Sequence, residues 1–249
     1  MRGQDTQAPY GVRLGWGRAG ASCLGPSVAA LVVVDVLSFT TSVSVVTGRG
    51  GAVVPCAWGD TRADALAAEL GGVVARGRSA ATADHPWSLS PAALLAAPVP
   101  PVLVLPSPNG SAISARADGP VLAGSLRSAR ATARWLADAG LGTPDHPVGL
   151  IAAGEQWPDG SLRPAVEDLL GAGAIAASLV RGCGMSASPE ARVAVAAFEG
   201  CADVAAELRD CVSGRELAAR GFGADVEVAA AVDADAHAAV LRDGAFRGA

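Results

Sequence analysis

The chain has 249 residues and a mass of 24.6 kDa, and 51% of its residues are hydrophobic with a mean hydropathy of +0.35, so it can bury a sizeable core. Its net charge is −5 at pH 7 and its 19 basic residues are scattered, which excludes the basic stripe of a nucleic-acid-binding protein. No apolar run is long and uninterrupted enough to span a bilayer, and the opening residues lack the apolar core of a signal peptide, so we expect a cytoplasmic protein with no membrane partner.

Short apolar runs alternate with amphipathic segments along the chain. The apolar runs predict strands over residues 28–37, 51–58, 72–76, 101–107, 120–124, 147–154 and 225–233. The amphipathic segments predict helices over residues 61–72, 89–97, 125–140 and 164–182, and residues 40–46 predict the start of another. Continuous apolar strands separated by helices are typical of a sheet that is covered on both faces. The expected fold is α/β, a three-layer α/β/α arrangement with a largely parallel or mixed central sheet.

We expect a single domain over residues 1–249. Residues 188–224 show an almost continuous helical pattern and predict a helical layer on the sheet. The loops at 85–91 and 142–147 are too short to be domain linkers. In such folds, ligand sites collect where the carboxyl ends of strands meet helix N-termini, so polar residues at those places are the candidates for a site.

Asp35 ends a run of β-branched apolar residues and is followed closely by Ser38, Thr40 and Thr41. A carboxylate there faces the site edge of the sheet, and hydroxyls with free N–H groups at a helix start suit an anion. The other interpretation is that Asp35 caps the helix and the threonines satisfy its unpaired N–H groups. The residues alone favour neither interpretation.

Asn109, Gly110 and Ser111 follow the strand predicted at 101–107. An Asn-Gly pair tolerates a left-handed backbone and can turn a nest of amides toward an anion. An ordinary turn before a helix explains the same residues, and the sequence alone favours that turn because Asn-Gly is a very common turn signal.

Glu167 and Asp168 head an otherwise apolar predicted helix. Adjacent helical residues point about 100° apart, so one carboxylate can face a site while the other bonds the backbone or a cation. A solvated surface position is one explanation, because burial of an unpaired carboxylate is costly. A Mg²⁺ ligand set is the other. Zinc is not expected, since the five cysteines and three histidines show no paired spacing.

All 19 basic residues are arginine, and the absence of lysine excludes both the P-loop lysine and a Schiff-base lysine. Arginine must therefore make any cationic contacts, and its forked guanidinium suits phosphate, sulfonate or carboxylate. Arg76, Arg78 and Arg127 lie near predicted strand ends and are candidate anion clamps, although a surface position is the commoner explanation for any one of them.

One reaction would use all of these groups: carboxylates to bind a divalent cation, amides and hydroxyls to bind an anion, and arginines to bind a second anion. Phosphoryl transfer to water uses a cation to neutralise the phosphoryl oxygens and positioned donors to hold the charge.

The segment VVVDVLSFTTSV, residues 32–43, resembles the signature of the 2-phosphosulfolactate phosphatase (ComB-like) family. The similarity continues in PNGSA, VLAGSLRS, VEDLLGAGAI and GADVEVAAAVD, in the family's order, over about residues 25–235. The order and spacing of these motifs together identify the chain as a divergent member of the family.

The resemblance implies a phosphatase that uses Mg²⁺ to hydrolyse the phosphate monoester of a small organic acid, 2-phosphosulfolactate or a related phospho-acid. It implies catalytic and metal-binding roles for Asp35, Glu167 and Asp168. A homodimer is the expected assembly. Contacts to the substrate are expected from Ser38, Thr40, Thr41, Asn109, Gly110, Ser111, Arg78 and Arg127.

Two departures from the family pattern bear on the substrate. The family's arginine after Val-Leu is Ser38 here, and the asparagine expected after Ser-Leu-Arg is Ser128. If that arginine grips the second anion of the substrate, then either Arg78 or Arg127 has taken over the role or the substrate has changed.

Two other functions were weighed against this one. Phosphatases of the haloacid-dehalogenase type need two aspartates two residues apart and a lysine, whereas Leu37 occupies the second place and lysine is absent. A non-catalytic or degenerate binding protein for a phosphorylated small acid is the alternative. Such a protein would not need metal ligands, so the presence of Asp35, Glu167 and Asp168 favours an enzyme.

Overall fold

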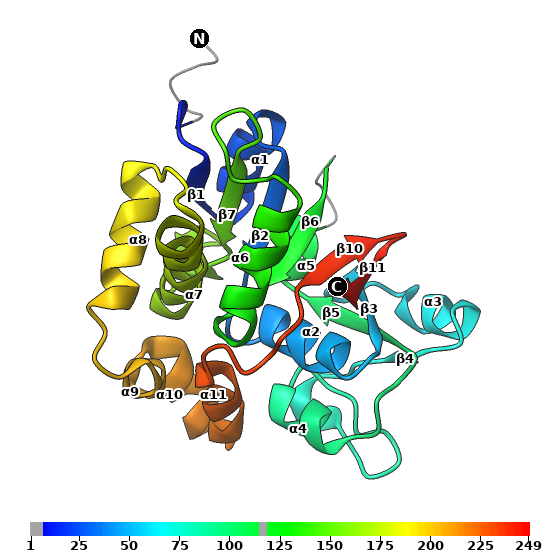
Figure 1. The fold of residues 1–249 in the computed structure, drawn as a ribbon. Coiled ribbons are helices and arrows are strands. Elements are labelled where there is room, and N and C mark those ends of the chain that lie inside the picture. The colour runs from blue at the N-terminus through cyan, green and yellow to red at the C-terminus, as the bar shows by residue number, and fades with distance from the viewer. Residues whose placement is uncertain (1–6, 115–118) are drawn as a thin grey trace.

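The computed structural model describes residues 7–114 and 119–249 (Figure 1). A nine-stranded sheet forms its centre, and two further short strands pair with each other as a separate hairpin. The strands of the sheet are β1 (Val12–Trp16), β2 (Ala30–Val34), β3 (Ala52–Ala57), β4 (Val73–Val74), β5 (Val102–Ser107), β6 (Val121–Gly124), β7 (Val148–Ala152), β10 (Ala239–Arg242) and β11 (Ala245–Gly248), and those of the hairpin are β8 (Glu155–Gln156) and β9 (Leu162–Arg163).

Helices cover both faces of this sheet (Figure 1). They are α1 (Gly17–Leu24), α2 (Phe39–Gly48), α3 (Ala63–Glu69), α4 (Pro91–Ala96), α5 (Gly110–Ser114), α6 (Ala129–Asp138), α7 (Val166–Ala177), α8 (Pro189–Glu199), α9 (Val204–Asp210), α10 (Val212–Ala219) and α11 (Gly223–Ala230).

The C-terminal hairpin of β10 and β11 joins two parallel half-sheets. One half contains β1, β7, β2 and β6, and the other contains β3, β5 and β4, with parallel pairing inside each half. β10 pairs antiparallel with β6, and β11 pairs antiparallel with β3. Because β10 and β11 are also antiparallel to each other, the two halves run in opposite directions. The sheet is therefore mixed, and the predicted fold class is confirmed.

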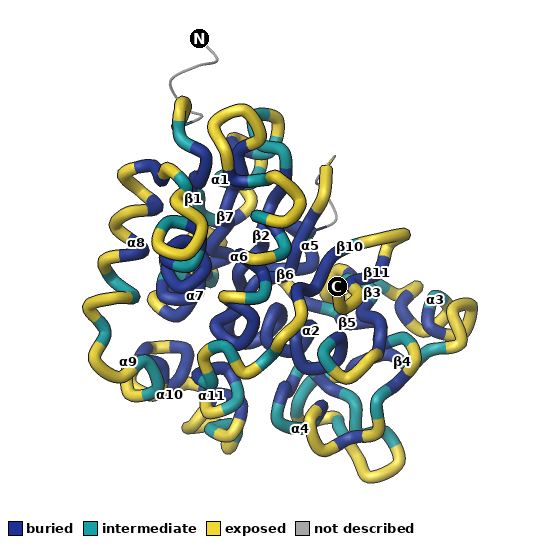
Figure 2. Tube along the Cα trace, viewed as in Figure 1, coloured by how far each residue is buried: buried dark blue, intermediate teal, exposed yellow. Residues whose placement is uncertain are grey.

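Alternate residues of β2 point into two different cores, as the two-residue period of a strand requires. Val32 and Val34 pack in a core with α6, α7 and α8, whereas Leu31 and Val33 pack in a second core with α2, α5 and β5. Every residue of β2 is buried (Figure 2). Burial on both faces explains why this strand is a continuous apolar run instead of an alternating one.

Helix α7 lies close to the end of β2 because its interior residues are small. A Cβ on Gly171 would come within 2.7 Å of Val36 Cγ2 and 2.9 Å of Val34 Cγ1, so only glycine allows this approach. The close contact brings the first turn of α7, with its two acids, against the segment that follows β2.

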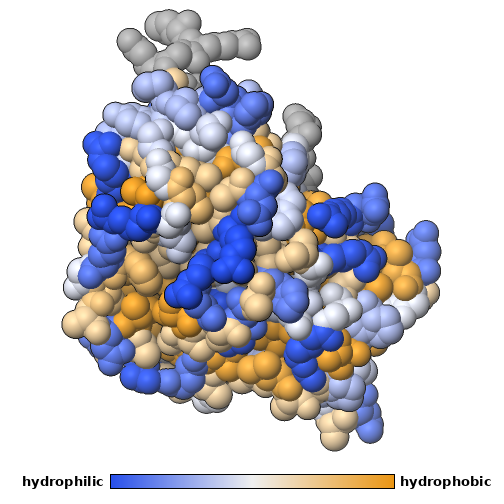
Figure 3. Space-filling model, viewed as in Figure 1, coloured by the Kyte–Doolittle hydropathy of each residue, from blue (hydrophilic) through white to orange (hydrophobic). Residues whose placement is uncertain are grey.

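Helix α6 shows the opposite pattern, with one apolar and one polar side. Its residues Ala129, Thr132, Ala133 and Leu136 are buried. A band of hydrophilic residues crosses the middle of the molecular surface over this helix (Figure 3). The helical period of the sequence therefore predicts the orientation of this helix correctly.

Most of the predicted elements are confirmed, but the strand predicted over residues 225–233 is wrong. Those residues form most of α11, and the buried ones, Asp225, Val226, Ala229 and Ala230, recur with the period of a helix. Its exposed Glu227 forms an ion pair with Arg209 of α9. The sequence analysis missed β1, the β8–β9 hairpin and the closing strands β10 and β11.

The helical segment predicted at 188–224 forms α8, α9 and α10, and α11 extends it. Within residues 7–114 and 119–249, no helix combines the length and hydropathy needed to cross a membrane.

Candidate active site

Asp35 directly follows β2 and is buried, with 7% of its surface exposed. Its Oδ1 accepts a hydrogen bond from the N–H of Phe39 at the start of α2, at 3.3 Å. Its Oδ2 accepts a second from the N–H of Gly110 at the start of α5, at 2.9 Å. Asp35 thus caps α2, as one interpretation of the sequence holds, and also links α2 to α5 across 75 residues of sequence.

Gly110 is needed for this contact. A Cβ at that position would lie 2.3 Å from Cδ1 of Phe39 and 2.8 Å from Oδ2 of Asp35. Real Cβ contacts are longer, so any side chain here would push α5 away from Asp35. The Asn-Gly turn therefore matters for close backbone approach, and Gly110 is a positioning residue in this structure.

The hydroxyls of Thr40 and Thr41 bond the turn between β2 and α2. Thr40 Oγ1 donates to the carbonyl of Asp35 at 2.8 Å, and Thr41 Oγ1 donates to the carbonyl of Val36 at 2.7 Å. Ser111 Oγ likewise donates to a backbone carbonyl, that of Ser107. In this structure the three hydroxyls hold the turns on which the site is built, and substrate contacts from them remain a prediction.

The two acids of α7 have different surroundings, and Asp168 is the one that bonds the backbone. Asp168 accepts hydrogen bonds from two backbone amides, Val36 N–H at 2.7 Å and Gly154 N–H at 2.8 Å. It therefore ties the segment after β2 to the end of β7. Glu167 is also buried, and its charge acts on Asp35 and on the thiol of Cys211.

Glu155 adds a fourth carboxylate, which the sequence analysis did not select as a site residue. Asn109 Nδ2 donates to its Oε2 at 3.1 Å, so the Asn-Gly turn fixes this side chain as well. The only sequence signal for it is its position: an acid three residues after the end of a buried strand, Val148–Ala152.

Burial raises the pKa values of three acids of this cluster, Asp35, Glu155 and Asp168. Burial raises the pKa of Asp35 to about 6, and the charge of Glu167 adds to the effect, while two amides and Arg78 oppose it. Burial and the charge of Asp35 raise the pKa of Glu155 to about 7. The pKa of Asp168 lies well above its usual range, because of burial first and then Asp35 and Glu167. Ionisation of these buried acids is therefore costly, and a positive charge beside them would reduce that cost.

Arg78 supplies a positive charge next to this cluster. Its Nη2 donates to Ser38 Oγ at 2.6 Å, so its guanidinium lies beside the position at which the family pattern has an arginine. Its Nε donates to Asp225 Oδ2 at 2.8 Å, and the Asp225 side chain is only 1% exposed. Asp225 also accepts hydrogen bonds from the side chain of Ser90 and the N–H of Ala92, so Arg78 is held in one position.

The other candidate arginines have different surroundings. Arg127 directs Nε and Nη2 to Asp235, each at 3.0 Å, and Nη1 to the carbonyl of Val228. All three nitrogens are thereby engaged in joining the segment before β10 to the segment after β6. Arg76 pairs with Asp64 on the exposed surface.

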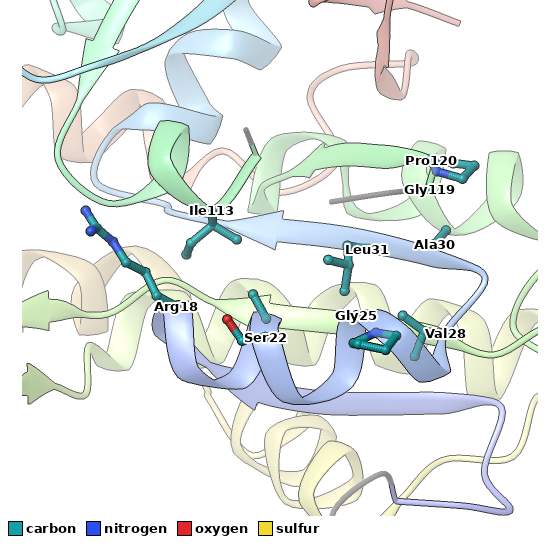
Figure 4. Close-up of a pocket in the computed structure, with 11 residues that line it drawn as sticks. Arg18, Ser22, Gly25, Val28, Ala30, Leu31, Ile113, Gly119 and Pro120 are labelled. Carbon is teal, nitrogen blue, oxygen red and sulfur yellow. The ribbon is translucent and has the colours of Figure 1, made fainter. Parts of the chain in front are cut away.

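A cavity of about 570 Å³ opens beside Arg78 and Glu155. It is also lined by Leu37 and Trp157, and by two further arginines, Arg163 and Arg220. A larger cavity of about 710 Å³ lies at the amino ends of β2 and β6, where Ile113, Leu31 and Pro120 point toward it (Figure 4). Among the described residues, Arg18 is its one charged lining residue and no carboxylate lines it, whereas Glu155 lines the first cavity, so the first adjoins the site.

No three Asp, Glu, His or Cys side chains in the described part of the chain are grouped closely enough to form a complete metal-ligand set. The donors present are hard carboxylate oxygens, which is the chemistry that Mg²⁺ prefers, and Mg²⁺ commonly takes only one or two carboxylates from the protein. The chemistry of these oxygens suits Mg²⁺, and magnesium binding at this site stays a prediction.

The mixed α/β sheet thus brings buried carboxylates beside an arginine-lined cavity, and these groups have the chemistry to bind an anion. A comparison with protein-family models is more specific. Residues 24–244 match the model of 2-phosphosulpholactate phosphatase, which covers most of the chain. The chain belongs to this family, whose members are phosphoric monoester hydrolases. A comparison with curated proteins gave no match.

Proposed function

We propose that the protein is a Mg²⁺-dependent phosphatase that hydrolyses a phosphate monoester of a small organic acid, 2-phosphosulfolactate or a related phospho-acid. The observation that carries the proposal is the cluster of buried carboxylates around Asp35, with the cation of Arg78 held against its edge. In this reaction a water oxygen bonds to phosphorus, the bond to the substrate's alkoxide oxygen breaks, and the alkoxide takes up a proton. The products are a hydroxy acid and inorganic phosphate.

Asp35 and Glu167 are the residues that would hold Mg²⁺. Both are buried, and each raises the electrostatic cost of a charge on the other, which a divalent cation would relieve. When bound, the ion would neutralise the phosphoryl oxygens as a Lewis acid. Asp168 would position the turn that carries Asp35, because its hydrogen bonds from the N–H groups of Val36 and Gly154 join the segments that follow β2 and β7.

Glu155 would move the proton. Its pKa of about 7 places it near the working pH, where one group can both accept and release a proton efficiently. Its hydrogen bond from Asn109 orients the carboxylate. Glu155 would accept the proton of the attacking water, and Arg78 would hold an oxyanion of the substrate beside Ser38.

Phosphate release from 2-phosphosulfolactate and from phospholactate tests this function. We expect release with Mg²⁺, loss of release in excess chelator, and recovery when Mg²⁺ is restored. Full activity in excess chelator would overturn the metal assignment. Binding of these acids with no release under any of the conditions would favour the non-catalytic binding protein.

A further inference from the structure

Two guanidinium groups lie over one aromatic ring at the edge of the candidate active site. Arg78 Cζ is 5.8 Å from the ring centroid of Phe222, and Arg220 Cζ is 5.9 Å from the same centroid. Both arginines also line the cavity of about 570 Å³ and a neighbouring cavity of about 450 Å³. An aromatic face attracts each cation, but two like charges on one ring also repel each other.

Only one of these two charges is neutralised by the protein. Arg78 pairs with Asp225 at 2.8 Å, through a carboxylate that is almost completely buried. Arg220 ends α10 and is exposed, and it has no ion pair with any residue in the ranges 7–114 and 119–249. The uncompensated cation therefore points to an anion that comes from outside the chain.

The third arginine of the cavity is already balanced. Arg163 Nη2 lies 3.7 Å from Glu216 Oε2, and its charge also acts on Glu155. Its guanidinium lies 5.8 Å from the ring centroid of Trp157, so its position is fixed by both an anion and an aromatic ring. Arg127, which the sequence singles out for an anion, is fully engaged with Asp235 and Val228.

We propose that Arg220 binds the second anionic group of the substrate, a sulfonate or carboxylate, and so determines substrate specificity. The inference rests on the proposed phosphatase function, because it assigns the part of the substrate that does not react. Arg78 then lies between the acid cluster and Arg220, and the substrate would extend from Asp35 toward Phe222. A guanidinium suits this role, since its planar fork can bond two oxygens of a sulfonate or carboxylate at once.

The kinetic test compares a substrate that has the second anion with one that lacks it. The ratio of kcat/KM for 2-phosphosulfolactate to kcat/KM for isopropyl phosphate is measured in the wild type and in Arg220→Gln. We expect this ratio to fall about 10-fold or more, as the loss of a charge-assisted hydrogen bond implies, mainly through KM for phosphosulfolactate. Arg220→Lys, which keeps the charge, should recover part of the ratio.

Arg134→Gln is the matched control, because Arg134 is an exposed arginine of α6 that lines neither of these two cavities. It should leave the ratio at its wild-type value. An unchanged ratio in Arg220→Gln, or an equal fall in the control, would overturn the assignment.

A binding measurement separates this inference from the proposed function. Calorimetric titration with sulfolactate, which carries the second anion but no phosphate, needs no turnover. We expect the wild type to bind it and Arg220→Gln to bind it about 10-fold more weakly. If no phosphomonoester is hydrolysed but this difference is seen, the phosphatase proposal fails and the anion site stands. If the wild type does not bind sulfolactate, or if both proteins bind it equally, the anion site fails.

Discussion

Asp35 has both carboxylate oxygens bonded to helix-start amides and is at the same time the centre of the acid cluster. Substitution of Asp35 distinguishes the two roles, because loss of a helix cap lowers stability whereas loss of a catalytic group lowers kcat. Asp35→Asn removes the charge that would face the cation, and its one oxygen can accept only one of the two amide hydrogen bonds. We expect kcat to fall roughly 100-fold or more, with only a small change in the melting temperature, because removal of the buried charge offsets the lost hydrogen bond.

Phosphate release and thermal unfolding measure the two effects. Asp145→Asn, in the exposed loop at 142–147, is the control and should change neither. A wild-type rate combined with a lowered melting temperature would show that Asp35 is only a cap.

The contact between Ser38 and Arg78 can also be tested, because Arg78 Nη2 donates a hydrogen bond to Ser38 Oγ. Ser38→Arg alone would bring two guanidinium groups together in a buried position and should destabilise the protein. The double variant with Ser38→Arg and Arg78→Ser moves the charge to the family's position. We expect the double variant to melt at a higher temperature than Ser38→Arg.

The same double variant should keep a KM for phosphosulfolactate close to that of the wild type, whereas Arg78→Ser alone should raise this KM about 10-fold or more. Phosphate release at varied substrate concentration gives KM for each variant. If Arg78→Ser has the wild-type KM, Arg78 does not contact the substrate.

At the scale of elements, the site depends on how closely α5 approaches α2. Gly110→Ala places a Cβ against the Phe39 ring and the Asp35 carboxylate. We expect it to cost roughly 1–3 kcal/mol in the free energy of unfolding, the usual effect of overpacking, and to lower kcat because Asp35 is displaced.

Urea unfolding and phosphate release measure these two quantities. Gly182→Ala is the matched control, since a Cβ there meets nothing within 4 Å. Equal stability of the two alanine variants would mean that α5 can move away from Asp35 without cost.

At the scale of the whole molecule, the acid cluster should make the stability of the metal-free protein depend on pH. The folded-state pKa values of Asp35 and Glu155, about 6 and about 7, lie above the pKa of about 4 of carboxyl groups in the unfolded chain. Each group therefore holds more protons in the folded state than in the unfolded state at pH values between its unfolded and its folded pKa. The free energy of unfolding must therefore fall as pH rises from about 4 to about 7, and the penalty is complete above that range.

Urea unfolding at pH 5.5 and pH 8.0, with and without Mg²⁺, checks this prediction. The first pH lies below the pKa of about 7 of Glu155, and the second lies above it. We expect the metal-free protein to be less stable at the higher pH, and Mg²⁺ to stabilise it more there, because ligand binding favours the state with ionised carboxylates. Glu155→Gln should reduce the pH dependence, whereas Glu69→Gln on the exposed end of α3 should not. A stability that rises between the two pH values would contradict the raised pKa values.

Most helices and most buried strands of the two half-sheets can be predicted from the sequence alone, because apolar runs and helical periods are local and do not depend on how the elements are arranged. β1 and α1 are exceptions. The sequence also marked Asp35, Asn109, Glu167 and Asp168, since polar residues at the ends of buried strands and at helix starts are unusual enough to be seen without a structure. For residues 225–233 the same kind of pattern failed, because DVEVAAAVD is compatible with both periods and only packing against α9, α10 and α4 favours the helix.

The junction between the two half-sheets and the pairing of charges are visible only in the folded protein. The pairing of β10 with β6 and of β11 with β3 depends on contacts between segments more than 100 residues apart, for which no local pattern exists. The same holds for Arg78 and Asp225, which are separated by 147 residues, and for the sharing of the Phe222 ring between Arg78 and Arg220. The energy of such contacts comes from burial and from charge at short distance, and both exist only after the chain has folded.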